Sequence, residues 1–245
     1  MAEALLTVAG LGKRFGGFIA LDGIDLEVKA GERVGLIGPN GSGKSTLVNC
    51  LSGILRNEEG SVRFDGAALD RLPAHRRTHR GLARSFQLPK PFGSLSVAEN
   101  LRIPLLYTVD GRNGVHLSEG DIAQRCEALL AMVALEGKAR ARPRDLTQIE
   151  MRKLELARAM AAEPRLLIAD EVMAGLSHAE VDEIIALLIR VNGQGVTVIM
   201  IEHIMRAVME VSQRLAVLVA GRKIADGDPK EVVRNPEVVK AYLGE

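Results

Sequence analysis

The feature that most constrains this chain of 245 residues is a glycine-rich stretch, GPNGSGKS, at positions 38–45. It matches the phosphate-loop pattern GxxxxGK[ST], and it lies between an apolar run at 33–37 and a helical stretch at 44–51. In such a loop the backbone N–H groups turn onto phosphate oxygens, and the helix N-terminus adds positive potential. An ordinary glycine-rich turn is the alternative, but the flanking strand and helix favour a phosphate site.

The side chains of this loop have distinct expected roles. We expect Lys44 to reach the terminal phosphates of a nucleotide and the Ser45 hydroxyl to ligate Mg²⁺. The remaining expected phosphate contacts come from the loop and the first helical turn: Asn40, Gly41, Ser42, Gly43 and Thr46.

A second motif decides among the many classes of protein that carry a phosphate loop. The apolar run LLIA at 166–169 is followed by Asp170 and Glu171. A strand that ends in Asp170 can deliver a carboxylate to the Mg²⁺ shell, and Glu171 can polarise an attacking water. Acidic side chains facing solvent after a strand are the alternative, which the phosphate loop makes the weaker interpretation. The pair of motifs predicts nucleotide hydrolysis.

The order of elements predicts an α/β fold. Strands at 166–169, 196–201 and 215–219 alternate with helices at 179–191 and 204–211, and this alternation indicates crossover units in a parallel sheet. Alternating apolar residues at 24–28 predict an antiparallel region near the start. Between 97 and 144 the pattern is helical, with inward-facing positions at Leu101, Leu105, Ile122, Leu129, Leu130 and Val133, and glycines near 111 and 114 interrupt it. We expect one domain over 1–245, with a helical subdomain at about 95–162.

Composition excludes several classes of function. The 32 Lys and Arg nearly balance the 31 Asp and Glu, so no electrostatic background favours nucleic acid. Two basic stretches, 75–80 and 138–144, are interpreted as solvated loops, because aromatic residues for base stacking are scarce around them. Cys50 and Cys126 are far apart, which argues against a disulfide framework. No apolar run approaches the roughly 20 residues that span a bilayer, and the N-terminus lacks a secretion signal, so we expect a cytosolic chain.

At this point the chain resembles the ATP-binding subunits of ABC transporters. Gln87, in GLARSFQ, resembles the glutamine that in this family contacts the metal and water beside the membrane partner. His203, after a strand, resembles the histidine that contacts the γ-phosphate, and Phe15 resembles the aromatic residue that stacks on adenine. Singly these would more often be a solvated glutamine, a helix cap and a core phenylalanine. Their order along nearly the whole chain favours the functional interpretation.

The resemblance implies a mixed sheet with an antiparallel β subdomain and a helical insert, with ATP and Mg²⁺ as cofactors. Within the family the chain is similar to the branched-chain amino acid importer ATPases, in the segments at 15–21, 84–87, 171–176 and 235–244. The implied partners are transmembrane permease subunits, a sister ATP-binding subunit in a homodimer or heterodimer, and indirectly a solute-binding protein, at the cytoplasmic face of the membrane. No nucleic-acid partner is expected. The alternatives are a lipid-export ATPase, a soluble ABC ATPase acting on nucleic acid, and a regulatory module with silent hydrolysis.

One segment departs from the family pattern. The signature Leu-Ser-Gly-Gly-Gln is replaced by LTQIE at 146–150, although Thr147 keeps a hydroxyl and is expected to contact nucleotide across the dimer. Ile149 puts a β-branched side chain where backbone should approach the γ-phosphate, and Glu150 brings a negative charge. The segment at 174–177, AGLS, also lacks the usual Asn or Asp. Either the pair of subunits is asymmetric, with one slow site, or this branch tolerates a variant signature in both sites.

Overall fold

Two sheets organise the computed structural model, which describes residues 4–86 and 88–243. The smaller, antiparallel sheet has the order β2-β1-β4-β5, and the larger has the order β10-β9-β3-β8-β7-β6. The strands are β1 (Ala4–Phe15), β2 (Phe18–Lys29), β3 (Arg33–Ile37), β4 (Glu59–Phe64), β5 (Ala67–Ala68), β6 (Leu82–Ser85), β7 (Leu166–Asp170), β8 (Thr197–Ile201), β9 (Arg214–Val219) and β10 (Arg222–Gly227).

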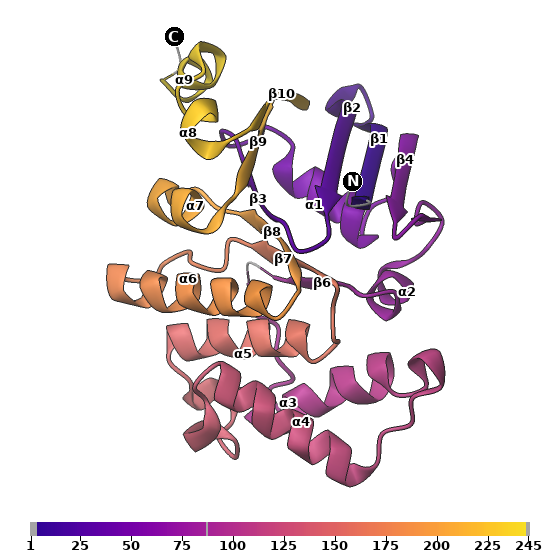
Figure 1. Ribbon diagram of the computed structural model, residues 1–245, viewed down its shortest axis with the longest axis vertical. Helices are drawn as coiled ribbons and strands as arrows, with labels where there is room; N and C mark the ends of the chain where they lie inside the picture. The colour runs from indigo at the N-terminus through magenta and orange to yellow at the C-terminus, as the bar shows by residue number, and fades with distance from the viewer. Residues whose placement is uncertain (1–3, 87, 244–245) are drawn as a thin grey trace.

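Helices surround the larger sheet, and Figure 1 shows α1 beside the smaller sheet with α5, α6 and α7 away from it. The α-helices are α1 (Lys44–Ser52), α2 (Ala74–His79), α3 (Val97–Pro104), α4 (Glu119–Met132), α5 (Gln148–Met160), α6 (His178–Gly193), α7 (Met205–Val211), α8 (Pro229–Val232) and α9 (Pro236–Leu243). Shorter π or 3₁₀ segments are η1 (Leu105–Val109), η2 (Arg112–Gly114), η3 (Glu136–Lys138) and η4 (Pro143–Asp145). The predicted α/β class, with its antiparallel subdomain and helical insert, is confirmed.

The larger sheet brings three distant segments to one edge. Strands β3, β8 and β7 are adjacent and parallel, and Leu36, Ile201 and Asp170 pair at the same level of the ladder. The carboxyl ends of parallel strands meet at the same edge of a sheet, which is where ligands bind in open α/β folds. The phosphate loop, the acidic pair at 170–171 and His203 therefore follow neighbouring strands.

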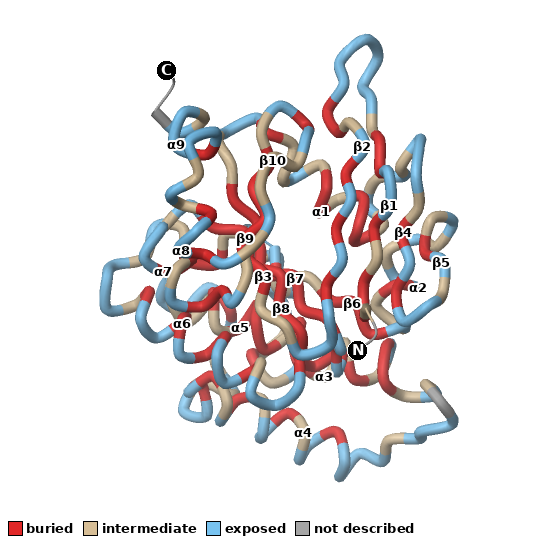
Figure 2. Tube along the Cα trace, turned by 45° about the horizontal axis from the view of Figure 1, so that its top comes forward, coloured by how far each residue is buried: buried red, intermediate tan, exposed pale blue. Residues whose placement is uncertain are grey.

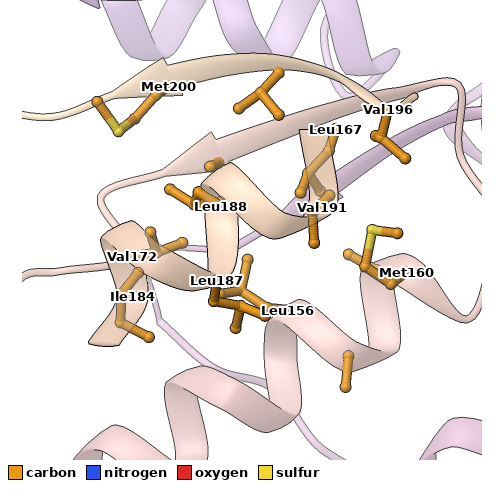
Figure 3. Packing of buried hydrophobic residues seen from close by; sticks show 14 of the residues in the cluster. Leu156, Met160, Leu167, Val172, Ile184, Leu187, Leu188, Val191, Val196 and Met200 are labelled. Carbon is orange, nitrogen blue, oxygen red and sulfur yellow. The ribbon is translucent and has the colours of Figure 1, made fainter. Parts of the chain in front are cut away.

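Both faces of the larger sheet are covered, as expected of strands buried on both sides. Leu166 and Ile168 of β7 face a cluster formed with α1 and the antiparallel sheet. Leu167 and Ala169 face the opposite cluster, formed with helices α3 to α7. Figure 3 shows side chains of α5 and α6 packing beneath β7 and β8 in that second cluster. Burial on both faces fixes the strand ends that hold the site.

Two expectations about the first half of the chain need correction. The strand expected at 24–28 is part of a hairpin of two strands of 12 residues each, β1 and β2, whose exposed tip projects from the molecule (Figure 2). The basic stretch at 75–80 is not a loop, because 74–79 form helix α2 and the Arg77 side chain is fully buried. Arg77 thus belongs to the interior, whereas His75, Arg76 and Arg80 of the same stretch are exposed.

The helical insert follows the predicted pattern. Leu101, Leu105, Ile122, Leu130 and Val133 are buried, and Leu129 is half-buried. Ser96 and Ser118 begin α3 and α4 with reciprocal capping boxes. Gly111 and Gly114 adopt positive φ angles where the helical pattern breaks. Among the described residues, no helix is both long and apolar enough to cross a membrane.

Candidate nucleotide-binding site

The phosphate loop joins the end of β3 to the start of α1, and its glycines are required by its surroundings. The φ angle is 151° at Gly38 and 103° at Gly43. A Cβ on Gly38 would lie 2.1 Å from the backbone oxygen of Leu218, and one on Gly43 would lie 2.7 Å from that of Ala20. Only glycine fits at these positions, because β9 and β2 hold the loop from two sides.

Lys44 begins α1 and turns back over the loop. Its Nζ donates to the backbone oxygens of Gly38 and Pro39, at 2.6 and 3.0 Å. Burial lowers the pKa of the Lys44 amine, and the carboxylates of Glu171 and Asp170 oppose that shift. The lysine therefore lies near both acidic residues, and its donors are held by carbonyls that incoming phosphate oxygens can replace.

The other expected phosphate contacts lie along the loop and the first turn of α1. Asn40, Gly41 and Ser45 are exposed, whereas Gly43 and Thr46 are half-buried. Ser42 is buried, and its Oγ has no hydrogen-bond partner among the described residues. A buried hydroxyl without a partner is costly in a folded protein, and a phosphate oxygen would satisfy it.

Asp170 ends β7 as a buried carboxylate with a partner that the sequence did not reveal. Its Oδ2 accepts a hydrogen bond from Nη2 of Arg84 at 2.5 Å, and both side chains are about nine-tenths buried. Arg84 belongs to β6, and 86 residues separate the two in sequence. No local pattern signals such a pair, because it depends on β6 and β7 being neighbours in the sheet.

The donors at this edge fit Mg²⁺ better than a transition metal. The described residues contain no group of three or more His, Cys, Asp or Glu that could hold a metal. Mg²⁺ shared with a nucleotide needs only one or two oxygen ligands from the protein, because waters and phosphates supply the rest. The Ser45 hydroxyl and the Asp170 carboxylate are ligands of that kind.

Glu171 has an unusual backbone conformation. Its φ angle is +49°, in the left-handed region that a non-glycine residue rarely adopts. The backbone N–H of Glu171 donates to the oxygen of Ile201 at 2.9 Å, which ties this position to the end of β8. Local strain of this kind is concentrated at functional sites. The conformation holds Glu171 just beyond the strand that positions Asp170.

His203 follows β8 and is exposed. It is not a helix cap, because α7 begins after Ile204 and has no side-chain cap. The preceding Glu202 is 2% exposed, and its Oε1 accepts from the backbone N–H of Met173 at 2.9 Å. Its Oε2 is buried without a hydrogen-bond partner among the described residues, and burial raises the pKa of this carboxyl. Sequence analysis missed Glu202, although a carboxylate directly after an apolar strand was a visible signal.

Phe15 lies at the exposed end of β1 rather than in the core. Its side chain is 48% exposed, and Nζ of Lys13 lies 5.3 Å from the ring centroid. A ring open to solvent at the tip of the β1–β2 hairpin is available for stacking. Gln87 lies outside the described residues.

The variant signature begins α5 with a capping box. The Thr147 hydroxyl accepts from the backbone N–H of Glu150 at 3.3 Å, and Glu150 Oε2 accepts from the N–H of Thr147 at 2.8 Å. The hydrogen bond from Thr147 lowers the pKa of Glu150, and Lys138 lies 3.4 Å from its Oε1. The negative charge at 150 therefore has a hydrogen-bond donor and a cation beside it within the chain.

Ile149 lies on the inward side of α5. Its side chain is half-buried against the apolar cluster beneath β7, so it does not obstruct the exposed start of α5. Gln148 and Arg152 both donate to the backbone oxygen of Ala174, at 3.4 and 3.1 Å. These contacts join the signature segment to the segment that follows Glu171.

Comparison with known proteins identifies the family. A model described as "ABC transporter" matches residues 21–174. This chain belongs to the ATP-binding cassettes of ABC transporters. It is accordingly the ATP-hydrolysing component of a transporter. A second model, described as "Branched-chain amino acid ATP-binding cassette transporter", matches residues 222–245.

Relatives and solved structures extend the similarity over the full length. The branched-chain amino acid transport ATP-binding protein BraF of Pseudomonas aeruginosa is 36% identical over 254 residues, which covers 100% of each chain. LivG of Escherichia coli is 34% identical over 258 residues with the same coverage. A cassette of an ABC transporter in its ADP conformation matches with a TM-score of 0.88 and 30% identity over 100% of each chain. A nucleotide-free cassette matches with a TM-score of 0.86 and 29% identity, over 99% of this chain and 100% of the other.

Proposed function

We propose that this chain is the ATPase subunit of an importer of branched-chain or related amino acids, bound to permease subunits at the cytoplasmic face of a membrane. The meeting of the phosphate loop, the acidic pair and His203 at adjacent strand ends supports the chemistry. The full-length similarity to branched-chain amino acid transport subunits supports amino acids as the transported solute.

The proposed mechanism assigns one role to each side chain of the site. Lys44 and the loop N–H groups hold the terminal phosphates, and Glu171 orients or deprotonates the attacking water. His203 holds the γ-phosphate, and Phe15 stacks on adenine. Ser45, Asp170 and Gln87 would hold Mg²⁺, whose positive charge would offset the charge of the phosphates.

The catalytic unit we propose is a pair of cassettes that close face to face, in a homodimer or with a sister subunit. Each ATP would lie between one phosphate loop and the start of α5 in the other subunit, where Thr147 supplies a hydroxyl. Inward packing of Ile149 and the internal compensation of Glu150 support a variant signature that works in both sites. Under that proposal Ile149→Gly leaves the ATPase rate of the transporter unchanged or lower. A clear rise would favour the asymmetric pair.

A groove beside β6 suits the permease. It encloses about 310 Å³, and its lining includes Ile54, Phe86, Phe92 and Tyr107. These four side chains are between 40% and 72% exposed. Such a concentration of exposed apolar surface is typical of an interaction site. Phe86, which lines this groove, precedes Gln87 in the sequence, and this supports a contact through which nucleotide occupancy reaches the permease.

The hydrolytic roles are tested with two variants of the purified chain. Glu171→Gln should retain ATP and accumulate a closed dimer, measured by size exclusion with MgATP, because binding remains while water activation is lost. Lys44→Ala should abolish the affinity for ATP. Rapid hydrolysis by Glu171→Gln would remove Glu171 from its role, and unchanged affinity in Lys44→Ala would overturn the site itself.

The cargo is tested in cells. Deletion of the gene should abolish uptake of radiolabelled leucine, isoleucine and valine, and Glu171→Gln should fail to restore it. Co-purification of permease subunits with the tagged chain separates a transporter subunit from a soluble ABC ATPase. Normal uptake in the deletion strain with altered lipid export would favour the lipid-export alternative. A purified complex that binds ATP without hydrolysing it would indicate a regulatory module.

A further inference from the structure

Arg84 connects three elements through one guanidinium group. It lies on β6 at the level of Ile168 in β7. Its Nη2 is 2.5 Å from Oδ2 of Asp170, and its Nη1 donates to Oδ1 of Asn49 at 2.7 Å and to Oγ of Ser52 at 3.2 Å. Asn49 and Ser52 belong to α1, the helix that begins at the phosphate loop. The group therefore joins β6, the acidic end of β7 and the helix of the phosphate loop.

This arrangement fixes the orientation of the Asp170 carboxylate. No other described residue donates a hydrogen bond to either of its oxygens, so Arg84 is its one protein partner in the part of the chain that the structure describes. A guanidinium is planar, and three acceptors hold this one in place, so it can hold a carboxylate in one geometry. With Oδ2 engaged, Oδ1 is the oxygen left for a ligand.

The same guanidinium also faces the groove beside β6. Its Cζ lies 5.3 Å from the centroid of the Phe86 ring, within the range of a cation–π contact. Arg84 and Phe86 both line the groove, and Phe86 is 40% exposed. An occupant of the groove that touches Phe86 therefore reaches the partner of Asp170 through one side chain.

We propose that Arg84 is a positioning residue that holds Asp170 in the orientation required by the Mg²⁺ of MgATP and links that carboxylate to the groove. This inference rests on the proposed function, because it takes Asp170 as a ligand of the metal. Arg84 itself contacts neither the nucleotide nor the metal.

A second arginine of the same groove provides a matched control. Arg158 on α5 pairs with the buried carboxylate of Glu155 at 2.7 Å, and its Cζ lies 5.1 Å from the ring of Phe92. Arg158, Glu155 and Phe92 also line the groove. This set repeats the chemistry of Arg84, Asp170 and Phe86, but its carboxylate does not lie at the edge of the sheet beside the phosphate loop.

The test measures metal affinity rather than hydrolysis. Mn²⁺ replaces Mg²⁺ as a paramagnetic probe, and its binding to the ATP-loaded chain is titrated by electron paramagnetic resonance. Arg84→Met should weaken Mn²⁺ binding at least about tenfold, because removing a partner of a metal ligand typically costs about 10- to 100-fold in affinity. The affinity for ATP in EDTA should stay within about twofold of wild type, because the phosphate loop is intact. Arg158→Met should change neither value.

The opposite sign would overturn the proposal. Removing a positive charge near a cation site by itself favours the cation, so unchanged or tighter Mn²⁺ binding in Arg84→Met would make Arg84 a competitor rather than a positioning residue. Arg84→Lys keeps the charge without the planar fork and should also bind Mn²⁺ more weakly, so it carries the test if the methionine variant fails to fold. Equal affinity in folded Arg84→Lys and wild type would refute the geometric role.

The link to the groove has its own pair of variants. Phe86→Ala should weaken Mn²⁺ binding about two- to fivefold, as expected for loss of one cation–π contact, whereas Phe92→Ala should not. Equal effects of the two substitutions would overturn the link. A wild-type chain that binds neither ATP nor Mn²⁺ with ATP would refute the proposed function instead, so the two failures are distinguishable.

Discussion

Replacing Arg77 tests how the phosphate-loop helix is supported. This side chain is 1% exposed, and it reaches the C-terminal end of α1 from α2. Its Nη1 donates to the backbone oxygens of Cys50 and Leu51 at 2.6 and 2.8 Å, and its Nε donates to that of Leu72 at 2.9 Å. The last carbonyls of a helix lack intrahelical partners and carry negative potential, so a buried cation is well placed there.

The magnitude follows from those three hydrogen bonds. Hydrogen bonds to a charged group contribute about 1.5–3 kcal/mol each, and Arg77→Met removes all three while keeping an aliphatic stem of similar length. The substitution also removes the desolvation cost of the buried guanidinium, which offsets this loss by several kcal/mol. We therefore expect the free energy of unfolding to fall by about 2–4 kcal/mol. Arg77→Lys keeps the charge but not the fork, so it should lose less.

Urea unfolding followed by far-UV circular dichroism measures this loss, since the chain has no tryptophan to report on it. With a slope of about 2–3 kcal/mol per molar urea, the midpoint should fall by about 1 M. The neighbouring Arg76 is exposed, and Arg76→Met should stay within about 0.5 kcal/mol of wild type. The reasoning fails if both methionine variants unfold at the same midpoint as wild type.

Three further predictions concern the site. Burial raises the pKa of Glu202, so the stabilising contribution of its protonated form is complete below the unfolded pKa of about 4.3 and is lost as pH rises through the folded pKa. Glu202→Gln should therefore raise the urea midpoint at pH 8 but not at pH 4. Gly38→Ala should abolish ATP binding in a filter assay, because its Cβ would lie 2.1 Å from the Leu218 oxygen. ATP binding by this variant would contradict the inference that only glycine fits at position 38. Thr147→Ala should cost about 1 kcal/mol in thermal unfolding, and Thr147→Ser should restore most of it; equal melting temperatures would deny the cap formed with Glu150.

Local patterns predicted the elements that flank the site. The strand at 33–37, the helix that begins at Lys44 and the strand ending in Asp170 all form where expected, because each has a strong apolar period and a turn or loop signal at its boundary. The antiparallel hairpin was underestimated, since β1 runs through positions that include glycine and charged residues. Its pairing with β2 and β4 overrides those local preferences.

Long-range partners could not be predicted in the same way. The stretch that contains Arg77 was interpreted as a solvated loop, and no role was predicted for Arg84, because the burial of both depends on the strand order. The surroundings of Ile149 and Glu150 were hidden for a related reason, since the rotation of α5 about its axis turns one inward and lets the other meet Lys138. A single sequence records the period of a helix but not the neighbour that each face meets.

The exposed ring at the end of β1 limits what this cassette can distinguish. Under the proposed function Phe15 offers the base a flat apolar face, and every nucleobase has a π surface that can lie on such a face. Selectivity among nucleoside triphosphates would then be weak. The relative abundance of the four triphosphates in the cell would determine which one is hydrolysed.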